Sequence, residues 1–320
     1  MGGIELKKAT ETHRPVMVRE VLEFLRPHPK GIYVDATLGG GGHAERILEA
    51  SYPTGKLIGF DVDPEAISFA KVMLSRFNER VTFVNENFTE IDRVLEEMGI
   101  GEVDGIIADL GMSSFQIELS GRGFSFLKDE PLDMRMNPRV QTTARDLVNE
   151  LKDIEIAGIL KKYGEESWAG RIAKEIVKRR EKKPIETSAE LAQIVEYAIP
   201  RRFHPTGIHP ATRTFQALRI AVNRELQNLE IFLRKAVEVL KKGARMVVIT
   251  FHSLEDRIVK SVFRELERGC ICPRGVPECR CGKKSLLKIL TPKPITPGLD
   301  EVRINKRARS AKLRASERMG

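Results

Sequence analysis

VDATLGGGGHA, residues 34–44, places four consecutive glycines directly after an apolar run that is typical of a buried strand. Glycine lacks a Cβ, so such a run lets the backbone turn sharply and approach a ligand closely. The ligands that suit a loop of this kind are a phosphate, a dinucleotide or a sulfonium nucleoside. The stretch therefore predicts a strand, a ligand-binding turn and a helix in succession.

The segments that follow this loop alternate as they do in an α/β protein. Short apolar runs predict strands at residues 32–36, 57–62, 81–85 and 103–110. Amphipathic stretches predict helices at residues 43–51, 64–77 and 88–98. Asp63 is a candidate N-cap for the second helix, and Pro64 suits its first turn. This alternation predicts βαβ units and a mostly parallel sheet.

A long helical stretch interrupts the strand pattern. Between residues 112 and 212 the sequence predicts helices at 144–151, 154–163, 166–181 and 188–198. Connections in α/β units are usually a few residues long, so this gap predicts an inserted helical subdomain. One amphipathic segment over residues 215–240 then leads into another buried strand at 244–251. We therefore divide the chain into a first core part (1–111), a helical insertion (112–212) and a second core part with a basic C-terminal tail (213–320).

The composition is basic, with a formal net charge of +9. Residues 302–320 hold many Arg and Lys side chains, with Glu317 as the acid among them. Either a polyanionic partner or a merely solvated terminus explains such a tail. The apolar runs are too short to cross a bilayer, and the N-terminus has no apolar stretch behind its charges. We expect a soluble protein that has no membrane partner and stays in the cytoplasm.

The cysteines form a paired C-x-C arrangement across a loop that contains Pro and Gly. They are Cys270, Cys272, Cys279 and Cys281. Four thiolates so close in sequence suit a tetrahedral zinc ion, although C-x-C spacing is less diagnostic than C-x-x-C. Reduced thiols without a metal are the alternative, and the sequence leaves both open.

The residues after the glycines narrow the choice of ligand. A Walker loop continues with Lys and Ser or Thr, whereas here Gly42 is followed by His43 and Ala44, which excludes ATP or GTP binding of that type. The dinucleotide pattern G-x-G-x-x-A does fit, with Asp61 about twenty residues further on. An NAD-dependent oxidoreductase is therefore one candidate function.

Asp35, at the carboxyl end of the first predicted strand, separates NAD from a sulfonium cofactor. A carboxylate here would repel the pyrophosphate of NAD, whereas it would attract the methionyl ammonium of S-adenosylmethionine. Asp61 would then accept hydrogen bonds from the ribose hydroxyls. The plainer alternatives are a turn-capping role for Asp35 and a helix-flanking role for Asp61. We favour S-adenosylmethionine as the cofactor.

Several longer segments are unusual in both composition and order. They are HRPVM (13–17), DATLGGGGH (35–43), DLGMSSFQ (109–116), RGFSF (122–126), PLDMRM (131–136) and FHSLEDR (251–257). In these segments the chain resembles the MraW/RsmH family of bacterial 16S ribosomal RNA cytidine N4-methyltransferases. The resemblance implies a class I S-adenosylmethionine-dependent methyltransferase fold, with a Rossmann-like, mostly parallel sheet and an inserted α-helical subdomain. It also implies methyl transfer to the N4 amine of a cytidine in 16S ribosomal RNA of the small ribosomal subunit.

The resemblance also implies a set of cofactor contacts. These are Gly41, Gly42, His43, Asp61, Phe88, Asp109 and Gln116. Phe88 either flanks the adenine or is a core aromatic that begins a helix. Asp109 is our candidate catalytic residue, because a group at the end of the fourth strand can orient the target amine. The alternative is a strand-end aspartate that binds only the cofactor.

Other residues have two interpretations each. His252 and Asp256 either position the substrate or cap the helix after the fifth strand. Three basic clusters, at 161–162, 178–180 and 201–202, either bind RNA phosphates or form solvated helix faces. Transfer from a sulfonium needs no covalent enzyme intermediate, so we expect direct in-line transfer. A non-catalytic RNA-binding protein on the same fold is a third functional class.

Overall fold

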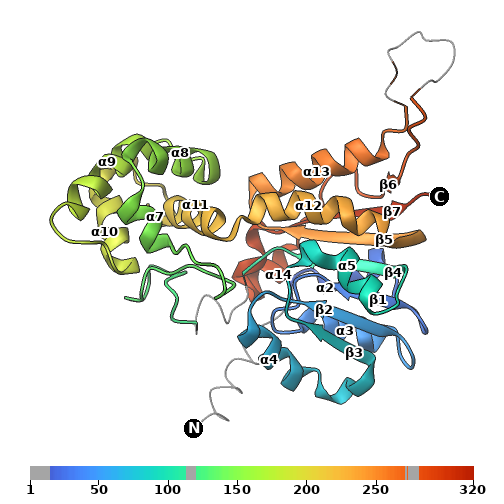
Figure 1. Ribbon diagram of the computed structural model, residues 1–320. Coiled ribbons are helices and arrows are strands. Elements are labelled where there is room, and N and C mark those ends of the chain that lie inside the picture. Colours follow the sequence, from blue (N-terminus) through green and yellow to red (C-terminus); the bar gives the residue numbers. More distant parts are fainter. Residues whose placement is uncertain (1–14, 113–119, 271, 273–280) are drawn as a thin grey trace. The chain divides into compact units, whose positions relative to one another are not determined.

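The computed structural model describes residues 15–112, 120–270, 272 and 281–320 (Figure 1). The chain divides into two compact units. The sheet unit comprises Met1–Gly111 and Leu226–Gly320, and the helical unit comprises Met112–Glu225. In the part of the chain that is described, no helix has the length and apolar character needed to span a membrane.

In its described residues the sheet unit has seven strands, in the order β3-β2-β1-β4-β5-β7-β6. The strands are β1 (Ile32–Asp35), β2 (Lys56–Phe60), β3 (Val81–Val84), β4 (Val103–Asp109), β5 (Leu240–Thr250), β6 (Leu287–Ile289) and β7 (Lys312–Arg318). Strands β1 to β5 pair in parallel, and β7 runs antiparallel to both β5 and β6. The predicted mostly parallel sheet is thus confirmed. Its strand order reverses between β1 and β4, where open α/β sheets bind ligands at the carboxyl ends of the strands.

Helices cover both faces of this sheet (Figure 1). They are α2 (Val18–Leu25), α3 (Gly42–Ala50), α4 (Pro64–Met73), α5 (Ile91–Glu97), α12 (Glu225–Glu238), α13 (Ser253–Glu267) and α14 (Leu299–Ile304), with short 3₁₀ turns η1 (Ser75–Arg80), η2 (Phe88–Glu90) and η4 (Lys306–Ser310). Successive strand residues point to opposite faces. Val34 of β1 therefore shares a core cluster with Phe232 of α12, while its neighbour Tyr33 shares another with Ile47 of α3.

The helical unit has a core of its own. It contains α7 (Ala144–Glu150), α8 (Asp153–Gly164), α9 (Ala169–Arg180), α10 (Ser188–Ala198), η3 (Arg201–Phe203) and α11 (Thr212–Asn223). The first four helices match the predicted ones to within a few residues. The compact unit extends to Glu225 rather than to residue 212, because the buried face of α11, including Phe215 and Leu218, belongs to the core of this unit.

Arg224 interrupts the amphipathic segment over residues 215–240. It ends α11 in the left-handed conformation, with φ 52° and ψ 35°, and its N–H donates to the Ile220 carbonyl. A left-handed residue cannot continue a right-handed helix. The single segment suggested by the apolar pattern is therefore two helices, α11 and α12.

The basic C-terminal segment is not a tail, which corrects the sequence-based division. Residues 312–318 form β7, which pairs with β5 over six registered positions from Arg245↔Glu317 to Thr250↔Lys312. Leu313 and Ala315 are fully buried in the core. Their apolar side chains alternate with charged ones, so the segment is a strand that sequence reasoning took for a solvated or polyanion-binding terminus.

Candidate functional site

Three aspartates follow adjacent strands at one edge of the sheet. Asp35 ends β1, Asp109 ends β4, and Asp61 comes directly after β2. Because β1 lies between β2 and β4 and all three strands are parallel, the structure brings the three residues to the same edge. This is the edge that the sequence predicted for ligand binding.

The glycine loop connects β1 to α3. Gly41 is the N-cap of α3 and has φ 82°, and its N–H donates to the Leu38 carbonyl at 2.7 Å. A Cβ at this position would be strained and would lie 3.0 Å from Cδ1 of Leu74. Gly42 begins the helix itself. The loop thus has a backbone path that only glycine follows without strain, and it borders the three aspartates.

Asp61 holds this loop through hydrogen bonds from backbone N–H groups. One carboxylate oxygen accepts a hydrogen bond from the Gly39 N–H at 2.8 Å, and the other accepts one from the Asp63 N–H at 2.9 Å. Asp61 therefore fixes the loop, and its contact with the ribose hydroxyls stays a prediction.

Asp35 is buried at the centre of the edge, with 2% of its surface exposed. Its carboxylate accepts a hydrogen bond from the Thr37 N–H at 3.1 Å. Burial raises the pKa of Asp35 to about 7, and the nearby charges of Asp109 and Asp61 act in the same direction, whereas His43 and the Thr37 N–H oppose it. A cation placed beside this carboxylate would favour its ionised form.

His43 and Asp109 face each other across the site. His43 Nε2 lies 3.5 Å from Asp109 Oδ2, with side chains that are 6% and 19% exposed. Among the described residues neither ring nitrogen of His43 has a hydrogen-bond partner, so its approach to Asp109 is close but is not a formed hydrogen bond. Buried polar atoms are normally paired, so these nitrogens mark a place where a ligand or water completes the site.

Thr37 is a member of the site to which the sequence assigned no role. Its hydroxyl oxygen accepts a hydrogen bond from the Asp109 N–H at 2.7 Å, which ties the end of β4 to the glycine loop. The sequence did hold a signal, because Thr37 stands where methyltransferase loops commonly have their first glycine. A threonine hydroxyl at this position can form a side-chain hydrogen bond, which a glycine cannot.

Phe88 and Gln116 were both predicted to contact the cofactor, but only Phe88 is among the described residues. Phe88 begins η2 after β3 and is half-buried, with its ring centroid 4.9 Å from that of Phe232. It packs against the core, as the alternative interpretation had it, and its contact with an adenine stays a prediction. Gln116 lies outside the described residues.

His252 and Asp256 have structural roles. His252 is the N-cap of α13: its Nδ1 accepts from the Glu255 N–H at 3.4 Å, while Glu255 accepts from the His252 N–H at 3.2 Å. Asp256 receives two hydrogen bonds from Arg314 of β7, at 2.6 and 3.1 Å. The helix-capping interpretation therefore holds for His252, whereas Asp256 lies inside α13 and joins it to β7.

Comparison with known proteins gives consistent matches over almost the whole chain. The model of the MraW methylase family matches residues 10–319. The ribosomal RNA small subunit methyltransferase H of Geobacter sulfurreducens is 56% identical over 97% of this chain and 100% of its own length. Proteins of the same name from Heliobacterium modesticaldum and Clostridioides difficile are 52% and 48% identical, each over 96% of this chain and 98% and 99% of their own lengths.

The cofactor of this chain is S-adenosylmethionine, and the described residues fit it. Asp35 offers a buried anion for an ammonium group, Asp61 offers acceptors for ribose hydroxyls, and Gly41 keeps the turn free of a side chain. The NAD-dependent alternative is excluded by the family match. The chain belongs to the MraW methylase family and has the class I methyltransferase fold.

Proposed function

We propose that the protein transfers a methyl group from S-adenosylmethionine to the exocyclic N4 amine of a cytidine in 16S ribosomal RNA. The substrate is the RNA of the small ribosomal subunit, and the reaction takes place in the cytoplasm, where subunits assemble. The names of relatives that are 48% to 56% identical support a ribosomal RNA of the small subunit as substrate. The position of Asp109 at the end of β4 is the observation that carries the choice of an amine acceptor.

The chemical difficulty lies in the acceptor. The N4 lone pair of cytosine is shared with the ring, so the amine is a weak nucleophile until that nitrogen becomes pyramidal. S-adenosylmethionine, when bound, supplies an electrophilic methyl group. Asp109 would accept a hydrogen bond from the N4 amine and hold its lone pair in line with that methyl group. The partly exposed Asp109 carboxylate suits this role, since it is reachable from outside the site.

Asp109 also has the rigid support that such a role needs. Its backbone N–H is held by Thr37 at 2.7 Å, and its carboxylate lies 3.5 Å from His43. Asp35 and Asp61 would hold the two ends of the cofactor on the adjacent strands. The reaction is then a direct in-line transfer whose rate depends on alignment.

The helical unit offers a surface that suits unstacked RNA bases. A pocket of about 440 Å³ is lined by Trp168, Phe203 and His209, among others. The Trp168 and Phe203 ring centroids are 5.1 Å apart, and the Arg202 guanidinium lies 4.8 Å from the Phe203 centroid. Sequence-specific RNA recognition uses splayed bases stacked on aromatic rings and guanidinium planes. We infer that nucleotides near the target cytidine bind in this pocket.

The basic clusters differ in how far the fold already uses them. Arg180 donates to the Val148 carbonyl at 2.7 Å, and Arg179 pairs with Glu175 at 3.0 Å, so that cluster supports the fold. Arg201 and Arg202 are exposed in η3, next to the pocket residue Phe203. They are the cluster best placed to bind phosphates beside a stacked base.

The proposed function predicts that the reaction product is N4-methylcytidine in 16S RNA. Incubation of the protein with S-adenosylmethionine and small subunits that lack the modification should yield N4-methylcytidine in 16S RNA, detected by nucleoside mass spectrometry. Free 16S RNA, assayed in parallel, shows whether the assembled subunit is required. A methyl group on another base or atom would overturn the assignment, and RNA binding without methyl transfer would favour the non-catalytic alternative.

Asp109→Asn should lower kcat by about 10²-fold, because the charged acceptor that orients the amine becomes a neutral amide. Its affinity for S-adenosylmethionine, measured by calorimetry, should change by no more than a few-fold. Asp300→Asn, an exposed acid on α14, serves as the control and should keep wild-type turnover. Full turnover and unchanged cofactor affinity in Asp109→Asn would remove this residue from the mechanism.

Cofactor affinity should depend on pH through Asp35. The ammonium group of the cofactor favours the carboxylate, and since the pKa of Asp35 is about 7, protonation competes with binding below that pH. The Kd should therefore rise toward about tenfold per pH unit as the pH falls below 7, and it should rise again above about pH 8, where the ammonium group loses its proton. Calorimetry from about pH 6 to about pH 8 measures this trend.

Asp35→Asn is the matched variant for that measurement. It should bind more weakly than the wild type at about pH 7.5, and it should lose the pH dependence below about pH 7, because its amide does not titrate. A wild-type Kd that stays constant over the same range would contradict the placement of the ammonium group beside Asp35.

Phe203→Ala should weaken binding of a 16S RNA fragment by about 1–3 kcal/mol, the usual contribution of one stacked base. Affinity for S-adenosylmethionine should not change, because Phe203 is not among the predicted cofactor contacts. Tyr197→Ala is the control, since Tyr197 is an exposed aromatic of α10 that is not among the pocket residues. Equal RNA affinities for the two variants would exclude stacking at this pocket.

A further inference from the structure

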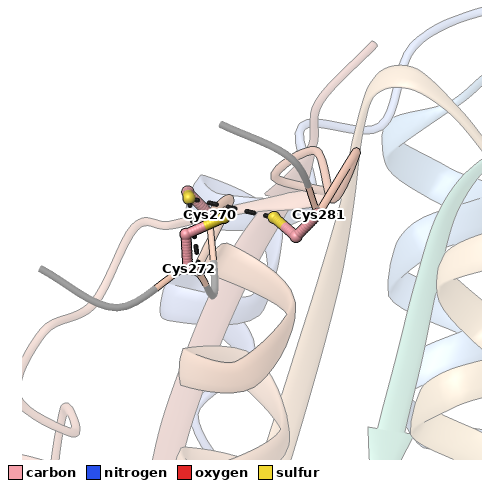
Figure 2. Close-up of side chains that lie close together, drawn as sticks. All are labelled: Cys270, Cys272 and Cys281. Carbon is pink, nitrogen blue, oxygen red and sulfur yellow. Dashed lines mark hydrogen bonds between the residues drawn. The ribbon is translucent and has the colours of Figure 1, made fainter. Parts of the chain in front are cut away.

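Three cysteines converge where the chain passes from α13 to β6. Figure 2 shows Cys270, Cys272 and Cys281 with their side chains grouped together, although Cys281 is separated from the others in sequence. Their sulfur atoms all lie within 4.8 Å of one another. All three are reduced, and the Sγ atoms of Cys270 and Cys281 are 3.8 Å apart, far beyond the length of a disulfide bond.

The spacing of the sulfur atoms is that of a tetrahedral metal site. Zinc–sulfur bonds are about 2.3 Å long, and the edge of a tetrahedron with that radius is about 3.8 Å. The Cys270–Cys281 separation has this value. The remaining sulfur distances require only a small contraction, since none exceeds 4.8 Å.

The surroundings also suit thiolates that bind a cation. The Cys272 N–H donates to Cys270 Sγ at 3.4 Å, and an amide donor of this kind stabilises negative charge on sulfur. The Arg268 side chain donates to the Cys270 carbonyl at 3.3 Å, which holds one positive charge beside the cluster. This cation offsets part of the negative charge of a thiolate cluster.

The cluster lies away from the cofactor edge. Helix α13 begins at Ser253, just after the carboxyl end of β5, and the cysteines follow its far end at Glu267. A helix of 15 residues is about 22 Å long. A metal at the cysteines would therefore be structural and would take no part in methyl transfer.

We propose that the thiolates of Cys270, Cys272 and Cys281 bind a structural Zn²⁺ ion that closes the loop between α13 and β6. Sulfur ligands in a tetrahedral arrangement select zinc over oxygen-preferring cations such as Mg²⁺. Three thiolates leave one position of the tetrahedron for a further ligand. Cys279, which the sequence analysis grouped with them, lies outside the described residues.

The metal would support the edge of the sheet, where β6 meets the end of α13. Strand β6 has three residues and pairs only with β7 among the described strands. Its approach is fixed by the Leu286 N–H, which donates to the Leu266 carbonyl of α13 at 2.9 Å. A zinc ion just before this point would fasten the end of α13 to the start of β6.

Elemental analysis of the full-length protein, purified under reducing conditions without chelators, tests the site. We expect about one zinc ion per chain in the wild type and in the control variant Lys284→Ala. Cys270→Ser and Cys281→Ser should lose most of the metal. Their affinity for S-adenosylmethionine should stay within twofold of wild type, which would show that the sheet unit is folded.

Cobalt provides a second readout that does not depend on the variants folding. Wild-type protein in which Co²⁺ replaces zinc should show a sulfur-to-cobalt charge-transfer band and the visible bands of a tetrahedral centre. A wild-type protein with no zinc, no such bands and fully reactive thiols would overturn the proposal. Full zinc content in Cys270→Ser and Cys281→Ser would do the same.

Discussion

A buried carboxylate at the end of β1 is the constraint on which the cofactor edge depends. Asp35 is 2% exposed, lies close to two other aspartates, and has a pKa raised to about 7 by its burial. An anion in this position is costly for the folded protein by itself, because burial disfavours the charged form. A cationic ligand removes that cost. The edge is therefore built for a ligand with a positive group near the centre of the sheet.

The fold around the parallel strands could be predicted because its signals are local. Apolar runs marked β1 to β4, and Asp63 with Pro64 marked the start of α4. The strand β7 could not be predicted, because the residues that show it to be a strand are its distant pairing partners. Its buried Arg314 is neutralised by Asp256, which is 58 positions away in the sequence, so a basic strand looks like a basic tail until the partner is placed beside it. Arg224 was missed for a related reason: the apolar pattern continues across it, and only its left-handed backbone divides the helix.

Some residues of the candidate site could likewise be predicted from local sequence signals, and others could not. Asp35, Asp61 and Asp109 were predictable because each follows a recognisable strand, and parallel strands bring such ends together. The role of Thr37 depends on a bond to Asp109 across 72 positions, which no spacing rule reveals. The sequence left open whether the His252 side chain positions the substrate or caps a helix, because only its contacts distinguish the two roles. Its ring accepts the Glu255 N–H, so this residue, which follows Phe251 after the end of β5, is the N-cap of α13.

The two ends of α13 meet different physical demands. At its first residue the helix borders the carboxyl ends of the strands, where groups must stay aligned around a ligand. At its last residue it meets a three-residue edge strand, and edge strands are short of partners by nature. The pair between Asp256 and Arg314 holds the first turn of α13 to β7. The cysteine cluster lies beyond the last turn. A cross-link at each end would keep the helix in register with the sheet and so keep β5, which precedes it, in place beside β4.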